Sequence, residues 1–146
     1  MPKAKLGTRS LERLETCEPD LVRVFKRVEQ ISPFDFTVIC GVRTDAEQKA
    51  LYAQGRTEPG PIVTTLDGVT KKSRHQPNAN GLSEAVDVAP WPIAWENKKQ
   101  FIAFGGVVMA AAEIESVRIR WGADWNSNWD LDEHSFVDLP HYELKT

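Results

Sequence analysis

Apolar residues recur at helical spacing over two stretches of the chain. From Pro19 to Ile31 they return every three or four positions, and a proline suits a first turn, so this stretch predicts an amphipathic helix packed on the core. Residues 97–116 are Ala-rich and predict a longer, mostly buried helix. Gly105 and Gly106 in its middle lower helix propensity by about 1 kcal/mol each. We therefore expect a neighbouring element to pack closely against this pair.

A further helix is predicted from its capping signal. Thr44 and Glu47 have the Thr-x-x-Glu spacing of a capping box, in which each side chain satisfies an amide at the start of a helix. We expect this helix over residues 45–54, and Gly55 suits the left-handed conformation that ends it.

Segments rich in β-branched or alternating apolar residues predict four strands, at residues 36–40, 84–88, 118–121 and 141–144. In the second of these, alternation places Asp87 on the face opposite Val86 and Val88. In the last, His141 and Glu143 share one face for the same reason. Chemically reactive side chains therefore lie on strand faces turned away from the apolar ones.

These elements predict an α+β fold, with a small antiparallel sheet that carries the candidate site on one face and helices packed around the other side. A length of 146 residues suits one domain, residues 1–146. Proline and glycine residues predict a loop over residues 56–76, with a short extended piece at 62–64. We interpret this loop as a flap on the substrate side.

Composition excludes some classes of partner. A net charge of −3 with intermixed signs leaves no basic stripe, so we expect no nucleic-acid partner. No apolar run approaches the ~20 residues that span a bilayer, so we expect no stable membrane association. Residues 1–5 include basic residues, but no apolar core of a secretory signal follows them, so we expect synthesis in a cytoplasm. No heptad pattern or long apolar edge argues against a monomer.

The cysteines and tryptophans have ordinary interpretations. Cys17 and Cys40 lie in helical and strand-like contexts, and reduced, half-buried thiols are favoured over a bridge because disulfides are rare in a cytoplasm. The five tryptophans all lie in the second half of the chain and could line a groove for sugar or peptide. Positions in the core or at its edge are favoured for Trp121 and Trp125.

Two histidines and an aspartate are the candidate metal ligands. His75 follows a cationic loop, while Asp87 and His141 lie on predicted strands. Two imidazoles and one carboxylate leave the fourth position of a tetrahedral zinc ion open, which is the arrangement of a catalytic site. The set favours a zinc hydrolase. Because these residues have no fixed motif spacing, solvated side chains or a neutral structural pair are the alternative.

Three further polar residues have a possible role in such a site. Asp138 lies three residues before His141 and could take a proton from water at the metal, or it could begin a turn. Glu143 could orient the imidazole of His141 through its second nitrogen, or be an exposed strand carboxylate. Arg43 could bind a substrate carboxylate or stabilise an oxyanion, or form a surface salt bridge.

The same residues lie within short blocks that run through the chain: Gly41-Val42-Arg43-Thr44, Glu47-Gln48, Leu51-Tyr52-Ala53-Gln54-Gly55-Arg56-Thr57-x-Pro59-Gly60, Ser73-x-His75, Ala85-Val86-Asp87, Gly122-Ala123-Asp124-Trp125 and Asp138-x-x-His141-x-Glu143. In content and order they resemble the VanY-like zinc peptidases, which are the D-Ala-D-Ala carboxypeptidases and L-alanyl-D-glutamate peptidases of the LAS metallopeptidase group. The resemblance covers about residues 20–144.

The resemblance implies a hedgehog/D-Ala-D-Ala peptidase-like fold and a bound Zn²⁺ ion. The implied zinc ligands are His75, Asp87 and His141. The implied catalytic base is Asp138, and Arg43 is implied to polarise the scissile carbonyl or hold the transition state. Ser73 and Gln48 are implied to border the site and bind substrate.

One stretch departs from the family pattern. The family's usual spacing is Ser-x-His-x-x-Gly-x-Ala-x-Asp, whereas residues 76–80 lengthen it here, so that Gly81 and Asp87 come about five residues late. A surface loop accommodates such lengthening at a small entropic cost, so Asp87 is retained as the ligand. Glu84 is the nearest alternative carboxylate.

Small members of this kind resemble phage endolysins that cut the L-alanyl-D-glutamate bond of peptidoglycan stem peptides. The resemblance implies the same activity for this chain. It implies that the protein acts on the cell wall after the host membrane is permeabilised. Two alternatives stay open. One is a D-Ala-D-Ala carboxypeptidase, which releases a terminal alanine. The other is a non-catalytic cell-wall-binding module, in which the same residues hold a structural zinc or none.

Overall fold

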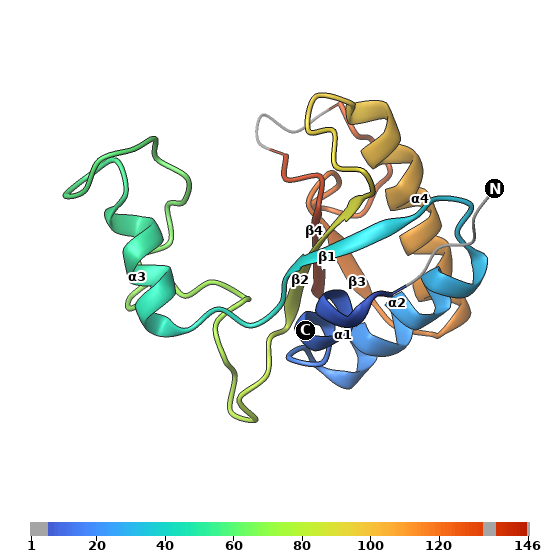
Figure 1. Cartoon of the computed structure of the whole chain (residues 1–146), viewed down its shortest axis with the longest axis horizontal. Helices are drawn as coiled ribbons and strands as arrows, with labels where there is room; N and C mark the ends of the chain where they lie inside the picture. Colours follow the sequence, from blue (N-terminus) through green and yellow to red (C-terminus); the bar gives the residue numbers. More distant parts are fainter. Residues whose placement is uncertain (1–5, 133–136, 146) are drawn as a thin grey trace.

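The computed structural model describes residues 6–132 and 137–145, so the basic N-terminal segment 1–5 lies outside the described part. Within it, the strands form one antiparallel sheet in the order β1-β2-β4-β3 (Figure 1). Their bounds are Phe36–Cys40 for β1, Ala85–Pro90 for β2, Ile119–Trp121 for β3 and His141–Leu144 for β4. Strands β2 and β4 are therefore central neighbours although they are far apart in the sequence.

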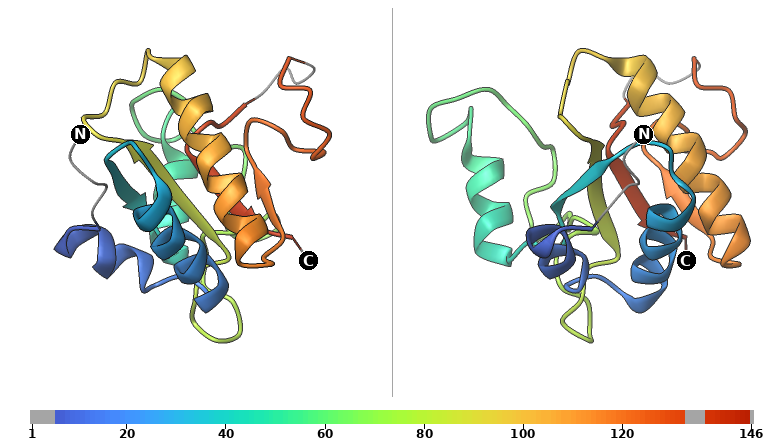
Figure 2. Two further views of the ribbon diagram at one scale, coloured as in Figure 1. Left: turned by 90° about the vertical axis from the view of Figure 1, so that its right-hand side faces the viewer. Right: turned by 45° about the vertical axis from the view of Figure 1, so that its right-hand side comes forward.

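Helices lie on both sides of this sheet, but unequally. One side is covered by α1 (Thr8–Leu14), α2 (Pro19–Ile31) and α4 (Lys98–Ile114), while α3 (Asp45–Ala53) and the loop after it stand on the opposite side (Figures 1 and 2). The predicted α+β arrangement, with helices packed around one face of a small antiparallel sheet, is confirmed.

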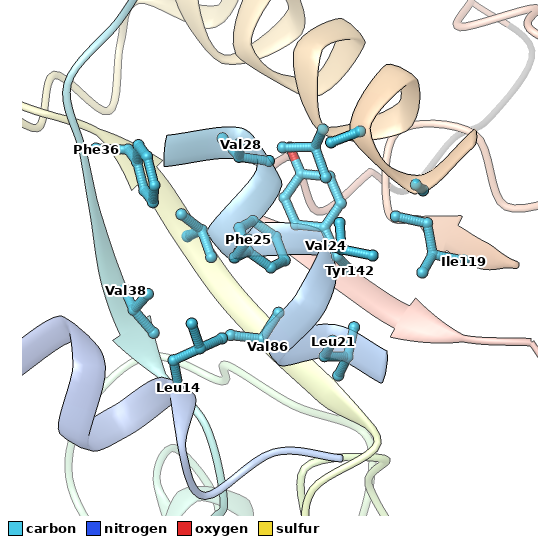
Figure 3. Close-up of a cluster of buried hydrophobic side chains, with 14 of the residues drawn as sticks. Leu14, Leu21, Val24, Phe25, Val28, Phe36, Val38, Val86, Ile119 and Tyr142 are labelled. Atoms are coloured by element: carbon cyan, nitrogen blue, oxygen red, sulfur yellow. The ribbon is translucent and has the colours of Figure 1, made fainter. Parts of the chain in front are cut away.

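The hydrophobic core lies between α2, α4 and the covered face of the sheet (Figure 3). Val86 and Val88 are completely buried there, as the alternation in β2 predicts, and so is Tyr142 of β4. The Tyr142 ring meets Phe25 of α2 edge-on and stacks on Trp121 of β3. Burial of these apolar faces fixes the register of β2 and β4, and so it also fixes which residues face the other way.

Close packing explains the glycine pair in α4 only in part. A Cβ on Gly105 would lie 2.1 Å from the indole of Trp121, so only glycine lets the helix approach β3 this closely. A Cβ on Gly106 would meet nothing within 4 Å. The predicted contact is therefore made by the first glycine of the pair.

Helix α3 begins at the predicted capping box. The Thr44 hydroxyl accepts a hydrogen bond from the Glu47 amide at 3.1 Å, and the Glu47 carboxylate accepts one from the Thr44 amide at 3.0 Å. The helix ends one residue earlier than predicted, and Gly55 follows with a φ of 80°. The extended piece predicted at residues 62–64 forms no strand.

Helix α1 was not predicted. Its apolar repeat consists of Leu11 and Leu14, a single turn, which is too short for a periodic pattern. The helix packs on β1, where the Ser10 hydroxyl accepts a hydrogen bond from the Val38 amide at 3.0 Å. Cys17 follows α1 and forms an isolated β-bridge with Ser83, so its expected helical context is wrong.

Both cysteines are free thiols, as predicted, with Cys17 buried and Cys40 partly buried. Among the helices of the described residues, none is long and apolar enough to cross a bilayer.

Candidate metal centre and cavity

The sheet register brings the candidate ligands together around β2. Asp87 is aligned with Cys40 of β1 on one side and with His141 of β4 on the other. His75 arrives from the loop before β2, and its carbonyl accepts a hydrogen bond from the Arg43 amide at 2.8 Å. Three segments that are distant in the sequence therefore meet at one carboxylate.

Asp87 links the two imidazoles. Its Oδ1 lies 3.3 Å from Nε2 of His75 and 3.2 Å from Nδ1 of His141, and the two rings meet edge-on with centroids 5.2 Å apart. His75 is 3% exposed and His141 8% exposed. The predicted ligands are thus adjacent and shielded, with Asp87 between the two rings.

The nitrogen of each ring that faces away from Asp87 has its own partner. Nδ1 of His75 lies 2.8 Å from the Gly41 carbonyl, and Nε2 of His141 lies 2.8 Å from the Glu143 carboxylate. An acceptor at one nitrogen fixes the proton there and leaves the lone pair of the other free for a cation, which is how metal-binding histidines are usually held. The geometry at Glu143 is the one required for the orienting role.

The possible ligand atoms fall into two overlapping groups, in each of which they lie within 4.8 Å of one another. The first contains Cys40, His75 and Asp87, and the second contains Asp87, Asp138 and His141. Imidazole, carboxylate and thiolate are all zinc ligands, so each group offers donors that fit such an ion. The groups of His75 and His141 share only Asp87, so neither group of the described residues contains all three predicted ligands. Cys40 was missed as a candidate because its place beside Asp87 depends on strand register, which the sequence does not reveal.

Electrostatics also suit a divalent cation. Burial, the largest single effect, lowers the pKa of each imidazole. Hydrogen bonds to Asp87 and to Cys40 or Glu143, together with the charge of Asp87, outweigh it and raise the pKa of His75 to about 10 and that of His141 to about 9. Burial alone raises the pKa of Asp87, yet the two imidazoles hold it below its ordinary value. The cluster therefore gathers positive charge around Asp87, in the form of protons that a metal ion can replace.

Asp138 is held beside this cluster by a close backbone contact. Its amide donates to the Gly122 carbonyl at 2.8 Å, and a Cβ on Gly122 would lie 2.1 Å from the Asp138 carbonyl oxygen. Glycine at position 122 therefore lets the turn before β4 approach β3. Burial, followed by the charge of Asp87, raises the pKa of Asp138 above its ordinary value.

A cavity of about 860 Å³ opens onto the cluster. Arg43, Ser73 and Asp138 lie on its wall together with the candidate ligands His75, Asp87, His141 and the neighbouring Glu143. Residues 62–66 line it from the loop predicted to be a flap. Trp125 is partly buried and also lines the cavity, with its ring centroid 5.7 Å from that of His141. Trp125 therefore lines the cavity, the groove position that the sequence left as the less favoured alternative, and it is not among the described residues of the hydrophobic core.

Two predicted or alternative residues lie away from the cavity surface. Gln48 is completely buried and does not line the cavity, although its side chain contacts Arg43. Glu84 pairs with Arg74 at 3.2 Å and belongs to neither ligand group of the described residues. The lengthened loop before β2 therefore leaves Asp87, and not Glu84, beside the histidines.

A buried cluster of imidazoles and carboxylates beside an open cavity is typical of metal-dependent hydrolases. Proteins that are similar to this chain in sequence and in fold include L-alanyl-D-glutamate peptidases. The profile of the phage L-alanyl-D-glutamate peptidase family matches residues 3–145. The L-alanyl-D-glutamate peptidase of Escherichia phage T5 is 31% identical over 146 aligned positions, which cover 96% of this chain and 97% of that protein.

A solved structure agrees with the sequence comparisons. The crystal structure of the L-Ala D-Glu endopeptidase ChiX of Serratia marcescens matches with a TM-score of 0.69 and 26% sequence identity, over 98% of this chain and 91% of that chain. The chain belongs to the phage L-alanyl-D-glutamate peptidase family. The resemblance found in the sequence blocks is confirmed.

Proposed function

We propose that this protein is a zinc-dependent peptidoglycan endopeptidase, an endolysin that hydrolyses the L-alanyl-D-glutamate bond of the stem peptide. The observation that carries the proposal is the geometry around Asp87. Its carboxylate lies between two imidazoles, each held by a hydrogen-bond acceptor at its other nitrogen, and it lines a cavity that Asp138 also lines. Membership of the peptidase family supplies the bond that is cut.

In this proposal His75, Asp87 and His141 hold the zinc ion. Bound zinc supplies a Lewis acid that polarises the scissile carbonyl and acidifies water. Asp138 takes the proton of the attacking water and delivers it to the leaving amine, and its burial, which raises its pKa, makes its carboxylate a better base. Arg43, on the cavity wall, donates hydrogen bonds to the oxygen on which negative charge develops.

The cavity suits an acidic peptide. Arg43 and Lys72 give its wall two cationic side chains in addition to Arg74, which pairs with Glu84, and D-glutamate brings a carboxylate to be recognised. Ser73, 8% exposed on the same wall, is the proposed polar contact to the substrate backbone. The proposed substrate places the site of action at the bacterial cell wall, and we propose that the protein acts there as a monomer.

Digestion of purified muropeptides tests this function. We expect mass spectrometry to show cleavage between L-alanine and D-glutamate, with a new amino terminus on D-glutamate. Loss of a terminal D-alanine alone would identify a carboxypeptidase instead. Binding to peptidoglycan without any cleavage, at full zinc content, would identify a non-catalytic module.

A further inference from the structure

Arg43 is held in place by a neutral side chain. Its Nη1 donates to the Gln48 Oε1 atom at 2.8 Å, and its Nη2 lies 3.9 Å from the Cys40 sulfur. A neutral acceptor orients a guanidinium without cancelling its charge, whereas a carboxylate would form an ion pair with it. The charge of Arg43 therefore stays available to a group in the cavity.

The same glutamine also holds the cavity wall. Gln48 is 0% exposed, and its Nε2 donates to the Leu66 carbonyl at 2.8 Å. Arg43 and Leu66 both line the cavity, while Gln48 lies behind them on α3. The oxygen and the nitrogen of one buried amide are thus both hydrogen-bonded. They join the strand-to-helix junction, where Arg43 lies, to the loop that contains Leu66.

We propose that Gln48 is a positioning residue, which fixes the Arg43 guanidinium and the Leu66 segment of the cavity wall in one mutual geometry. The proposal rests on the proposed function, because it takes Arg43 to contact the reacting carbonyl. A buried amide with both hydrogen bonds made is costly to disturb, so the arrangement is rigid before substrate binds. Preorganised donors of this kind are the ones that stabilise developing charge effectively.

The chain offers a matched control in a second buried glutamine. Gln76 is 4% exposed, and its Nε2 donates to Asp45 at 2.8 Å and to the Gly68 carbonyl at 3.0 Å. Its Oε1 accepts a hydrogen bond from the Ser73 amide at 2.8 Å. Gln76 therefore ties the same loop to α3 and to the Ser73 segment but makes no hydrogen bond to Arg43 among the described contacts. A purely structural effect on the loop is expected from either glutamine, whereas an effect through Arg43 is expected from Gln48 alone.

The test measures kcat on the muropeptide substrate for Gln48→Met and for Gln76→Met. Each substitution is made once in the natural chain and once in a chain that already carries Arg43→Lys. We expect Gln48→Met to lower kcat by about 10- to 100-fold with zinc content unchanged, because small misplacement of a catalytic group has effects of this size. With Arg43→Lys already present, the same change is expected to lower kcat less than about twofold, as for residues that act as a unit. Gln76→Met is expected to have the same effect in both chains. An equal effect of Gln48→Met in both chains would overturn the proposal.

Two further measurements separate the possible outcomes. Nuclear magnetic resonance of the Arg43 Nε–H group reports its order without any reaction, and we expect that order to fall in Gln48→Met and to persist in Gln76→Met. Unchanged order in folded Gln48→Met protein would contradict the positioning role. If the natural chain itself fails to cut muropeptides, the proposed function fails, whereas cleavage combined with an effect of Gln48→Met independent of Arg43 overturns the positioning role alone.

Discussion

His75 and His141 face Asp87 through different ring nitrogens, because each ring is held from behind by a different acceptor. The Gly41 carbonyl holds Nδ1 of His75, and the Glu143 carboxylate holds Nε2 of His141. An acceptor in that position also makes the opposite nitrogen a better metal ligand. In the proposed zinc site, we therefore expect the residues behind the ligands to contribute to metal affinity.

Glu143 should accordingly be needed for tight zinc binding. We expect Glu143→Ala to weaken zinc affinity by about 10- to 100-fold, the usual effect of losing such a partner, and Glu143→Gln to retain more of it because an amide oxygen still accepts the hydrogen bond. Competition with a chelator of known affinity measures this. Glu84→Ala is the control, since Glu84 pairs with Arg74 away from the ligand groups. Equal affinities for Glu143→Ala and the natural chain would remove Glu143 from the site.

Asp138 should matter for hydrolysis but not for metal content. We expect Asp138→Asn to bind zinc and melt as the natural chain does, yet to lose about 10²- to 10⁴-fold in kcat, because an amide cannot take the proton from water. Elemental analysis, thermal melting and muropeptide turnover check the three expectations. Substantial hydrolysis by a fully metal-loaded Asp138→Asn protein would show that another group is the base.

Sequence and structure agree on which side chains gather, but the sequence could not supply their orientation. Strand alternation was enough to place Asp87, His141 and Glu143 on one face of the sheet. Which nitrogen of each ring faces Asp87 depends on the Gly41 carbonyl for His75 and on the Glu143 carboxylate for His141. The first is a contact between segments distant in the chain, and the second depends on how two side chains of the same strand are rotated, which alternation does not specify.

At the scale of elements, α4 approaches β3 through one glycine. Gly105 lies against the Trp121 indole, whereas Gly106 is exposed and has open space at its Cβ position. We expect Gly105→Ala to lower the free energy of unfolding by about 1–3 kcal/mol through overpacking. Gly106→Ala, its matched control, should raise it by up to about 1 kcal/mol through helix propensity. Urea unfolding measures both, and equal effects would mean that the helix does not pack on Trp121 in this way.

Helices with a clear local signal in the sequence were predicted well, and the helix without one was not predicted. The apolar period of α2 and the capping box of α3 are local, so the sequence alone indicates their position. The stability of α1 comes instead from tertiary contacts, with Leu14 completely buried in the core and Ser10 hydrogen-bonded to β1. Packing of this kind is invisible to a local pattern.

At the scale of the whole molecule, the site exists because the sheet places β2 between β1 and β4. That order aligns Asp87 with Cys40 on one side and with His141 on the other. A sequence pattern reveals strands but not their neighbours, so it missed Cys40 and did not place Trp125 at the cavity. Resemblance to a family supplied the pairing of His75, Asp87 and His141 that alternation alone left open.

Zinc affinity should rise with pH, because zinc must displace protons from His75 and His141. The pKa of His75 is raised to about 10 and that of His141 to about 9, both above the ordinary 6.5, so both rings carry protons near neutral pH until a metal displaces them. We therefore expect apparent zinc affinity to rise from pH 6 to pH 8, with protons released on binding. Calorimetry in buffers of different ionisation enthalpy measures that release. An affinity that stays constant over this range would show that the rings are already neutral.

The most direct test is the position of the metal itself. Anomalous X-ray scattering from crystals of the zinc-loaded protein should show one strong peak bonded to Nε2 of His75, to the Asp87 carboxylate and to Nδ1 of His141, within reach of Asp138. A peak elsewhere, or one that leaves either histidine unbonded, would contradict the account.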